Sequence, residues 1–210
     1  MTPPPTGGTT YGWSDAAAPH SCAYLVGPVV RLCRELGARR VLDVGCGNGA
    51  LAAALAAGGF DVTGCDDDAA GVEIARRVAP AARFESVGVY DDPARLGVAD
   101  FDVAVATEVI EHLFRPAALP QFATAVLKPR GHLILTTPYH GYLKNLALSL
   151  ANGWDRHFSP LWDGGHIKFW SPATLTQLLN REGYDVVRIT GSGRVRWFWK
   201  SMIVVARKRT

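Results

Sequence analysis

The sequence contains no hydrophobic run that approaches the roughly 18 residues required for a membrane-spanning helix. Its four cysteines form no Cys-x-x-Cys pair, which argues against a zinc knuckle and against a thioredoxin-type redox site. The formal net charge is only +3, which is too small to indicate a nucleic-acid-binding protein by itself. We therefore expect a cytoplasmic protein with reduced, buried thiols, and nucleic acid is a disfavoured partner.

The first ten residues are rich in Pro, Gly and Thr and contain no apolar segment, so they do not resemble a signal peptide. We expect a flexible leader over residues 1–19 and one domain over residues 20–210. With 210 residues, 48% of them hydrophobic and 20% charged, the chain can bury a core without disulfides or a structural metal.

Apolar strands and helices alternate between residues 40 and 136. Strands are expected at residues 40–45, 60–65, 82–89, 101–106 and 132–136, with helices at residues 20–36, 50–57, 69–78 and 117–127. Alternation of this kind predicts an α/β fold, in which a parallel sheet is covered by helices on both faces.

The alternation then ends. Residues 138–165 are aromatic and glycine-rich, and we expect them to be irregular. Ser171 before a proline is typical of a helix start, and we expect a helix over residues 172–181. Two further strands, at residues 184–189 and 202–206, are joined through Gly-Ser-Gly and predict a hairpin-like connection.

A glycine-rich segment, Asp43-Val-Gly-Cys-Gly-Asn-Gly49, lies between the first expected strand and its helix. Glycines let the backbone turn sharply and let a ligand approach the main chain closely. Dinucleotide sites use the spacing Gly-x-Gly-x-x-Gly instead, and Asp43 would repel a diphosphate but suits a cationic ligand. A second acid, Asp66, follows the second strand, where a carboxylate can accept hydrogen bonds from ribose hydroxyls.

A run of metal-ligating side chains, Glu108, Glu111 and His112, follows the fourth strand. On a helix these side chains would converge on one face, at the carboxyl end of a central strand, where open parallel sheets bind ligands. Two carboxylates and an imidazole can hold Mg²⁺ or Mn²⁺, and His166 offers a fourth donor. The alternative is a metal-free site in which the acid orients the loop or contacts the substrate.

The segment from Val41 to Gly49 resembles the first motif of class I S-adenosylmethionine methyltransferases, and the resemblance extends over about residues 20–207. It implies a Rossmann-like, mostly parallel seven-stranded sheet with helices on both faces and an antiparallel last strand. It also implies a set of cofactor-binding residues: Asp43, Gly45, Cys46, Gly47, Asp66, Asp67, Val89 and Thr107.

Within that set the resemblance places Asp43, Gly45 and Gly47 beside the methionine part and Asp66 at the ribose. Asp67 would lie beside the adenine. The chain departs from the family pattern at Gly88, where many relatives have an acid or a hydroxyl, so the Val89 main chain is the remaining candidate for the adenine contact.

The Glu-x-x-Glu-His run resembles two branches of the family, the O-methyltransferases of ubiquinone biosynthesis and the 2′-O-methyltransferases of small-RNA 3′ ends. Both resemblances imply that Glu108, Glu111, His112 and His166 bind a metal that holds neighbouring hydroxyls. The expected catalytic residues are His112, His166 and Glu108, and without a metal one of the two histidines is the expected base.

We therefore expect O-methylation of a small hydrophobic or aromatic hydroxylated metabolite, with S-adenosylmethionine and Mg²⁺ as cofactors. Residues 138–170 are expected to form a lid over this acceptor. Peripheral contact with a membrane surface, or a cover for the sheet edge, are the alternatives for that segment. For the whole chain the alternatives are a metal-dependent RNA 3′-end 2′-O-methyltransferase, which the mild charge disfavours, and a cofactor-binding protein without transferase activity.

Overall fold

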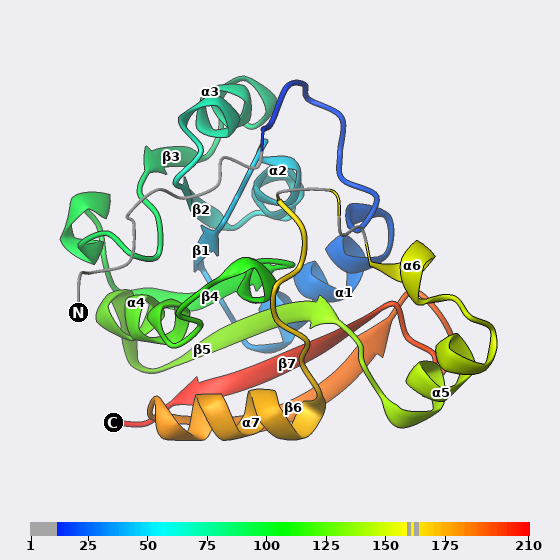
Figure 1. Cartoon of the computed structure of the whole chain (residues 1–210). Helices are drawn as coiled ribbons and strands as arrows, with labels where there is room; N and C mark the ends of the chain where they lie inside the picture. The colour runs from blue at the N-terminus through cyan, green and yellow to red at the C-terminus, as the bar shows by residue number, and fades with distance from the viewer. Residues whose placement is uncertain (1–11, 159–160, 162–163) are drawn as a thin grey trace, which may run out of the picture.

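A twisted sheet forms the centre of the computed structural model, which describes residues 12–158, 161 and 164–210. In this part of the chain seven strands lie in the order β3-β2-β1-β4-β5-β7-β6 (Figure 1). Their bounds are β1 (Arg40–Val44), β2 (Asp61–Asp66), β3 (Arg83–Ser86), β4 (Phe101–Thr107), β5 (Leu127–Pro138), β6 (Tyr184–Ser192) and β7 (Ser201–Lys208). Strands β1 to β5 pair in parallel and β7 is antiparallel to both neighbours, so the predicted α/β architecture is confirmed.

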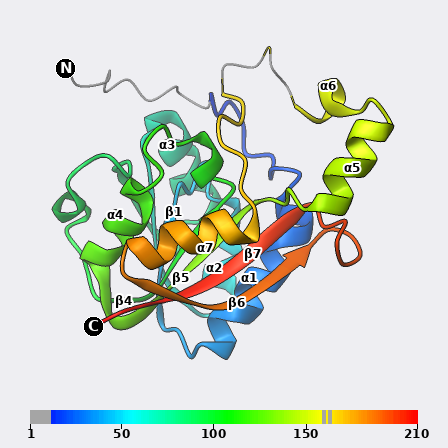
Figure 2. The ribbon, with the colours of Figure 1, turned by 60° about the horizontal axis from the view of Figure 1, so that its bottom comes forward.

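Helices cover both faces of this sheet. On one face lie α1 (Cys22–Glu35), α2 (Ala50–Ala57) and α3 (Ala69–Val78), and on the other lie α4 (Ala118–Val126) and α7 (Pro172–Arg181) (Figures 1 and 2). Successive side chains of a strand point to opposite faces. In β4, accordingly, Val103 and Val105 belong to the core under α1, α2 and α3. Ala104 and Ala106 belong to the core under α4 and α7. Burial on two faces explains why the central strands are almost wholly apolar.

The helix that begins after Ser171 shows how local sequence sets an element boundary. The Ser171 hydroxyl accepts a hydrogen bond from the Thr174 amide at 3.2 Å, and the Thr174 hydroxyl accepts one from the Ser171 amide at 3.0 Å. Pro172 occupies the first turn, where its missing N–H is not needed. This reciprocal cap confirms the predicted start of α7.

Two expectations for the region after β4 are wrong. Residues 138–165 are not irregular throughout, because α5 (Tyr142–Leu150) and α6 (Trp154–His157) lie within them. Glu108 and Glu111 do not share an α-helix, because the chain turns at Glu108 with a φ of +55° and continues as the short 3-10 helix η2 (Ile110–His112). The Glu108 amide is held by the Thr136 carbonyl on β5 at 3.1 Å, which keeps it in line with the sheet. A second 3-10 helix, η1 (Pro93–Leu96), lies between β3 and β4.

The predicted fifth strand, at residues 132–136, is part of a longer strand. Strand β5 begins at Leu127, and its pairing with β4 shifts register between Phe101 and Val103. Arg130 takes a φ of +62° at this irregularity. Of the predicted leader, residues 1–11 lie outside the described part of the chain. None of the helices in the described part is long and apolar enough to cross a membrane.

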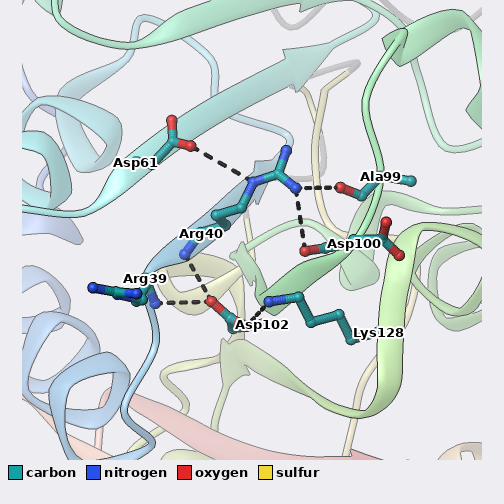
Figure 3. Close-up of polar contacts among 7 residues, drawn as sticks. All are labelled: Arg39, Arg40, Asp61, Ala99, Asp100, Asp102 and Lys128. Carbon is teal, nitrogen blue, oxygen red and sulfur yellow. Dashed lines mark hydrogen bonds and ion pairs between the residues drawn. The ribbon is translucent and has the colours of Figure 1, made fainter.

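A carboxylate joins the amino ends of three neighbouring strands, at the edge opposite the glycine loop (Figure 3). One oxygen of Asp102 accepts the amide N–H groups of Arg39 and Arg40 at 2.9 Å each, and the other accepts the Lys128 ammonium at 2.5 Å. Burial acts to raise the pKa of Asp102, but the Arg40 amide, the Lys128 ammonium and the Arg39 amide together lower it. Asp102 thus stabilises the ends of β1, β4 and β5.

We predict that Asp102→Ala lowers the free energy of unfolding at pH 7 by about 1–3 kcal/mol, because three N–H donors lose a charged acceptor. The native pKa is lowered, so this stabilisation is present above the ordinary aspartate pKa and is lost as the pH falls through the native pKa. Urea unfolding of wild type and variant at pH 7 and pH 3 measures the difference. Asp61→Ala is the control, because its contact with Arg40 is an exposed pair at 3.6 Å. An Asp102→Ala effect of equal size at both pH values would contradict this role.

Candidate functional site

The glycine segment forms a tight loop between β1 and α2 at the carboxyl edge of the sheet. Gly45, Gly47 and Gly49 all have positive φ angles, of +71°, +50° and +81°. A Cβ atom at Gly49 would lie 2.8 Å from the Cα of Ala75 on α3. The glycines therefore serve the backbone turn and the close approach of neighbouring groups, which are Val109 at Gly45, Trp13 at Gly47 and α3 at Gly49.

Asp43 is a buried carboxylate directly before this loop. Its residue is 1% exposed, and neither side-chain oxygen has a hydrogen-bond partner within the described residues. Burial, followed by the charge of Asp66, raises the pKa of Asp43 to about 7. A buried anion without donors is costly. Burial therefore favours the protonated form of Asp43, and a cationic ligand would stabilise its carboxylate.

Asp66 connects the end of β2 to the glycine loop. Its carboxylate accepts the Gly47 amide at 2.8 Å and the Asp68 amide at 2.9 Å. Burial raises the pKa of Asp66 to about 7, although both amides act to lower it. Asp66 therefore ties the end of β2 to the glycine loop, and each of its oxygens accepts one backbone amide.

The neighbouring predicted residues lie around the same edge. Asp67 is exposed, and a Cβ atom at Gly88 would lie 2.8 Å from the Asp67 Cβ, so the departure at Gly88 makes room for this acid. Val89 is partly buried and packs against the core. The Cys46 side chain packs in the core, so only its main chain is part of the glycine loop. Thr107 is the last residue of β4.

A second group of side chains lies at the ends of β4 and of the loop before α7. Glu111, His112 and His166 each offer one ligand atom, and these atoms lie within 4.8 Å of one another. Glu111 is fully buried, and neither of its carboxylate oxygens has a hydrogen-bond partner in the described part of the chain. Burial, followed by the charge of Glu108, raises the pKa of Glu111 well above its ordinary value. The three residues form a carboxylate–imidazole cluster.

The surroundings lower the pKa of both imidazoles of this cluster. Burial, helped by the neighbouring His112, lowers the pKa of His166 to about 4, and burial also lowers the pKa of His112. The His112 Nδ1 atom lies 3.3 Å from the Gly165 carbonyl, and the Ile167 amide donates to the Glu111 carbonyl at 3.0 Å. These bonds attach the His166 loop to η2, so the sequence separation between the two parts of the cluster is bridged by backbone contacts.

The fourth predicted ligand, Glu108, lies outside the cluster. Its carboxylate accepts hydrogen bonds from the Thr136 hydroxyl at 2.8 Å and the Ser201 hydroxyl at 3.1 Å. The Ser201 oxygen lies 3.2 Å from the Tyr24 hydroxyl. Burial raises the pKa of Glu108 to about 7. Sequence reasoning missed Thr136, Ser201 and Tyr24, because strands and helices far apart in the chain supply them and no local motif marks them.

An aromatic group lies beside the cluster, within the segment predicted to form the lid. Phe158 stacks on Trp154 with ring centroids 5.1 Å apart, and it lies 4.5 Å from the Phe169 ring. His140 packs against His157 at 5.6 Å. We call these five side chains the aromatic wall. Burial, followed by the Lys144 charge, lowers the pKa of His140 to about 4, and the same two causes lower the pKa of His157.

Comparison with known proteins gives consistent matches. A family model described as a methyltransferase domain matches residues 22–189. The ubiquinone biosynthesis O-methyltransferase of Thiobacillus denitrificans is 28% identical over 160 residues, which cover 74% of this chain and 68% of the relative. That of Vibrio campbellii is 29% identical over 156 residues, which cover 73% of this chain and 66% of the relative.

Solved structures share the fold. Magnesium protoporphyrin IX methyltransferase from Synechocystis PCC 6803 with bound SAH has a TM-score of 0.66 at 22% identity, with 88% of this chain and 82% of that chain covered. The methyltransferase domain of bacterial-CtHen1-CN has a TM-score of 0.64 at 23% identity, with 87% and 97% covered.

The raised pKa of Asp43 predicts a pH-dependent stability. A carboxyl group with a native pKa of about 7 and an unfolded pKa of about 4 favours folding at low pH, and this contribution is lost as the pH rises through 7. We predict that Asp43→Asn, which cannot ionise, melts several degrees above the wild type at pH 8 and close to it at pH 5 when no nucleoside is added. Circular dichroism melts measure this, with the exposed Asp61→Asn as the control. Parallel pH profiles for Asp43→Asn and wild type would show that Asp43 is not a strained anion.

Proposed function

The chain belongs to the methyltransferase domain family and is an S-adenosylmethionine-dependent methyltransferase, and from this premise we propose that it methylates a hydroxyl oxygen of a small aromatic or hydrophobic metabolite. The observation that carries the proposal is the carboxylate–imidazole cluster, with its unpaired Glu111 carboxylate, next to the aromatic wall. Relatives named for O-methylation in ubiquinone biosynthesis support the same chemistry.

The residues around the glycine loop suit the cofactor. Asp43 is an unpaired buried anion, which fits a ligand with a positive sulfur and an ammonium group. Asp66 would accept the ribose hydroxyls, and Asp67 and the Val89 main chain would lie beside the adenine. The main chain of residues 45–47 would border the methionine part, with Thr107 at its far side. When bound, S-adenosylmethionine supplies a methyl carbon that is already activated, so the protein must align the acceptor and exclude water.

The cluster would prepare the acceptor oxygen. A phenolic hydroxyl has a pKa near 10, so a group of the protein must assist the loss of its proton at neutral pH. His166 and His112 can take that proton, and the Glu111 carboxylate, 4.0 Å from the His166 Nε2 atom, would stabilise the imidazolium that forms. The aromatic wall would orient an aromatic ring by stacking and edge contacts. Glu108, held by two hydroxyls, would act as a positioning residue.

The same cluster fits a divalent ion. Glu111 brings carboxylate oxygens that have no other partner, and His112 and His166 bring two nitrogens. Because Glu108 lies outside, the donor set is one carboxylate and two imidazoles, which favours a transition metal such as Mn²⁺ or Zn²⁺ over the expected Mg²⁺. A bound ion would supply Lewis-acid chemistry to the acceptor hydroxyl.

The acceptor chemistry is testable by mass spectrometry of products formed from S-adenosylmethionine. We predict O-methylation of dihydroxy-aromatic acceptors and none of amines or of an RNA 3′ end. Glu111→Gln should lower kcat by about 100-fold or more, the range of a lost acid–base partner. The exposed Glu73→Gln on α3 should retain activity. Methylation of amines or RNA in place of phenols would contradict the proposal.

Chelation in the same assay distinguishes a cluster that binds a divalent ion from a metal-free cluster with a histidine base. If an ion is bound, EDTA abolishes activity, and Mn²⁺ restores it more fully than Mg²⁺. Full activity after exhaustive chelation would eliminate the ion and leave the histidine base, in which case His166→Ala should still abolish turnover.

We also propose that the protein makes peripheral contact with a membrane surface through helix α5. Helix α5 stands out from the body of the fold (Figure 2) and has no buried residue. It exposes Tyr142, Leu143, Leu146 and Leu150, and it contains a lysine but no acid. Such a helix suits the surface of a bilayer that holds an apolar acceptor.

We predict that the protein sediments with phosphatidylglycerol vesicles and that replacing Leu146 and Leu150 by Asp prevents this. Val187→Asp, at an exposed apolar position on β6, is the matched control and should sediment normally. Wild-type protein that stays in the supernatant would contradict the contact.

A further inference from the structure

We propose that residues 12–17 form a cover over the S-adenosylmethionine site and that Trp13 is a cofactor-binding residue. This segment precedes α1 and carries no recognisable motif. Figure 1 shows it in dark blue, running from α3 past α2 towards the start of α1, along the carboxyl edge of the sheet. The proposal rests on the use of S-adenosylmethionine stated above.

The indole of Trp13 lies directly on the main chain of the cofactor loop. A Cβ atom at Gly47 would lie 2.4 Å from the Trp13 Cζ2 atom, and one at Gly71 would lie 2.8 Å from its Cδ1 atom. Any side chain at either position would displace the indole. Gly47 is in the loop that borders the cofactor, and Gly71 is in the first turn of α3, so Trp13 spans the two elements that define this end of the site.

Asp68 attaches the cover to α3. One of its oxygens accepts the amides of Ala70 and Gly71 at 3.0 and 3.3 Å and so caps the helix. The other accepts the amides of Gly12 and Trp13 at 3.2 and 3.4 Å. A helix cap requires one side-chain oxygen. The second oxygen of this buried carboxylate is therefore used to hold the cover.

Asn48 attaches the other end of the cover to the glycine loop. It is 1% exposed, and its amide nitrogen donates to the Asp15 carbonyl at 3.3 Å and to the Ala17 carbonyl at 2.7 Å. Asn48 thus lies in the loop after β1, which carries Asp43, and Asp68 lies in the loop after β2, which ends at Asp66. Because both ends of residues 12–17 are hydrogen-bonded to loops of the binding site, the mobility of this segment should change when a ligand occupies the site.

An indole in this position offers what a sulfonium nucleoside requires. Its face can contact a positive charge or stack on a base, and its area excludes water from the reacting groups. The cover would therefore slow the dissociation of the cofactor. If the indole instead occupied the place of the cofactor at Gly47, removing it would strengthen cofactor binding. The change in affinity on removing Trp13 therefore has opposite signs for a cover and for a competitor.

Calorimetric titration with S-adenosylmethionine and with S-adenosylhomocysteine tests the cover. We expect Trp13→Ala to weaken both affinities about tenfold, mainly through faster dissociation, and Trp13→Phe to weaken them less. Asp68→Ser keeps an oxygen for the α3 cap but removes the acceptor for the cover, so it should weaken binding in the same direction. Trp197→Ala, which removes an indole from the β6–β7 connection, is the control and should bind normally.

Hydrogen exchange supplies a second measurement that does not depend on a variant. In the wild type, amides of residues 12–17 should exchange more slowly when the nucleoside is bound. Unchanged or tighter binding by both Trp13→Ala and Asp68→Ser, or no slowing of exchange, would overturn the cover while leaving the methyltransferase activity intact. A wild-type protein that binds no nucleoside would overturn both.

Discussion

Burial of carboxylates at one edge of the sheet is the constraint on which the rest of the site depends. Asp43 and Glu111 are almost completely buried, and within the described residues their carboxylate oxygens make no hydrogen bond of ordinary geometry. An unpaired buried anion destabilises a fold, unless a proton or a ligand compensates for it. The fold therefore carries two carboxyl groups whose ionised forms a ligand would stabilise, and under the proposed function these ligands are the cationic cofactor and a group that activates the acceptor.

The end of β4 separates the roles of two similar acids. The left-handed backbone at Glu108 directs its carboxylate to hydroxyls on β5 and β7, whereas η2 directs Glu111 towards His112 and His166. One acid is thus hydrogen-bonded by hydroxyls of the protein, and the other lies beside the two histidines. Under the proposed function, the cluster would therefore offer an ion one carboxylate and two imidazoles.

Long-range contacts complete both ends of the site. The cofactor end has a local foundation in the glycine loop and Asp66, but its surface also carries Trp13, which two distant residues hold in place. The acceptor end is built from three segments, β4 with η2, the α5–α6 region and the loop before α7. The Glu111 carbonyl accepts the Ile167 and Lys168 amides of the loop that carries His166, and this loop also brings Phe169 against Phe158.

The sequence by itself determined most strands and helices between residues 40 and 136, the helix after Ser171 and the glycine loop. Apolar strands between helices, the glycine run after Asp43 and the cap at Ser171 act through neighbouring residues, so each was predictable and lies where local preference places it. Tertiary structure decided that Glu108 leaves the cluster, that Trp13 rests on Gly47, and that residues 142–150 are helical although none of them is buried. These outcomes depend on one backbone angle and on partners many residues away, because the direction of a side chain at a strand end is set by what packs against it and not by its neighbours in the chain.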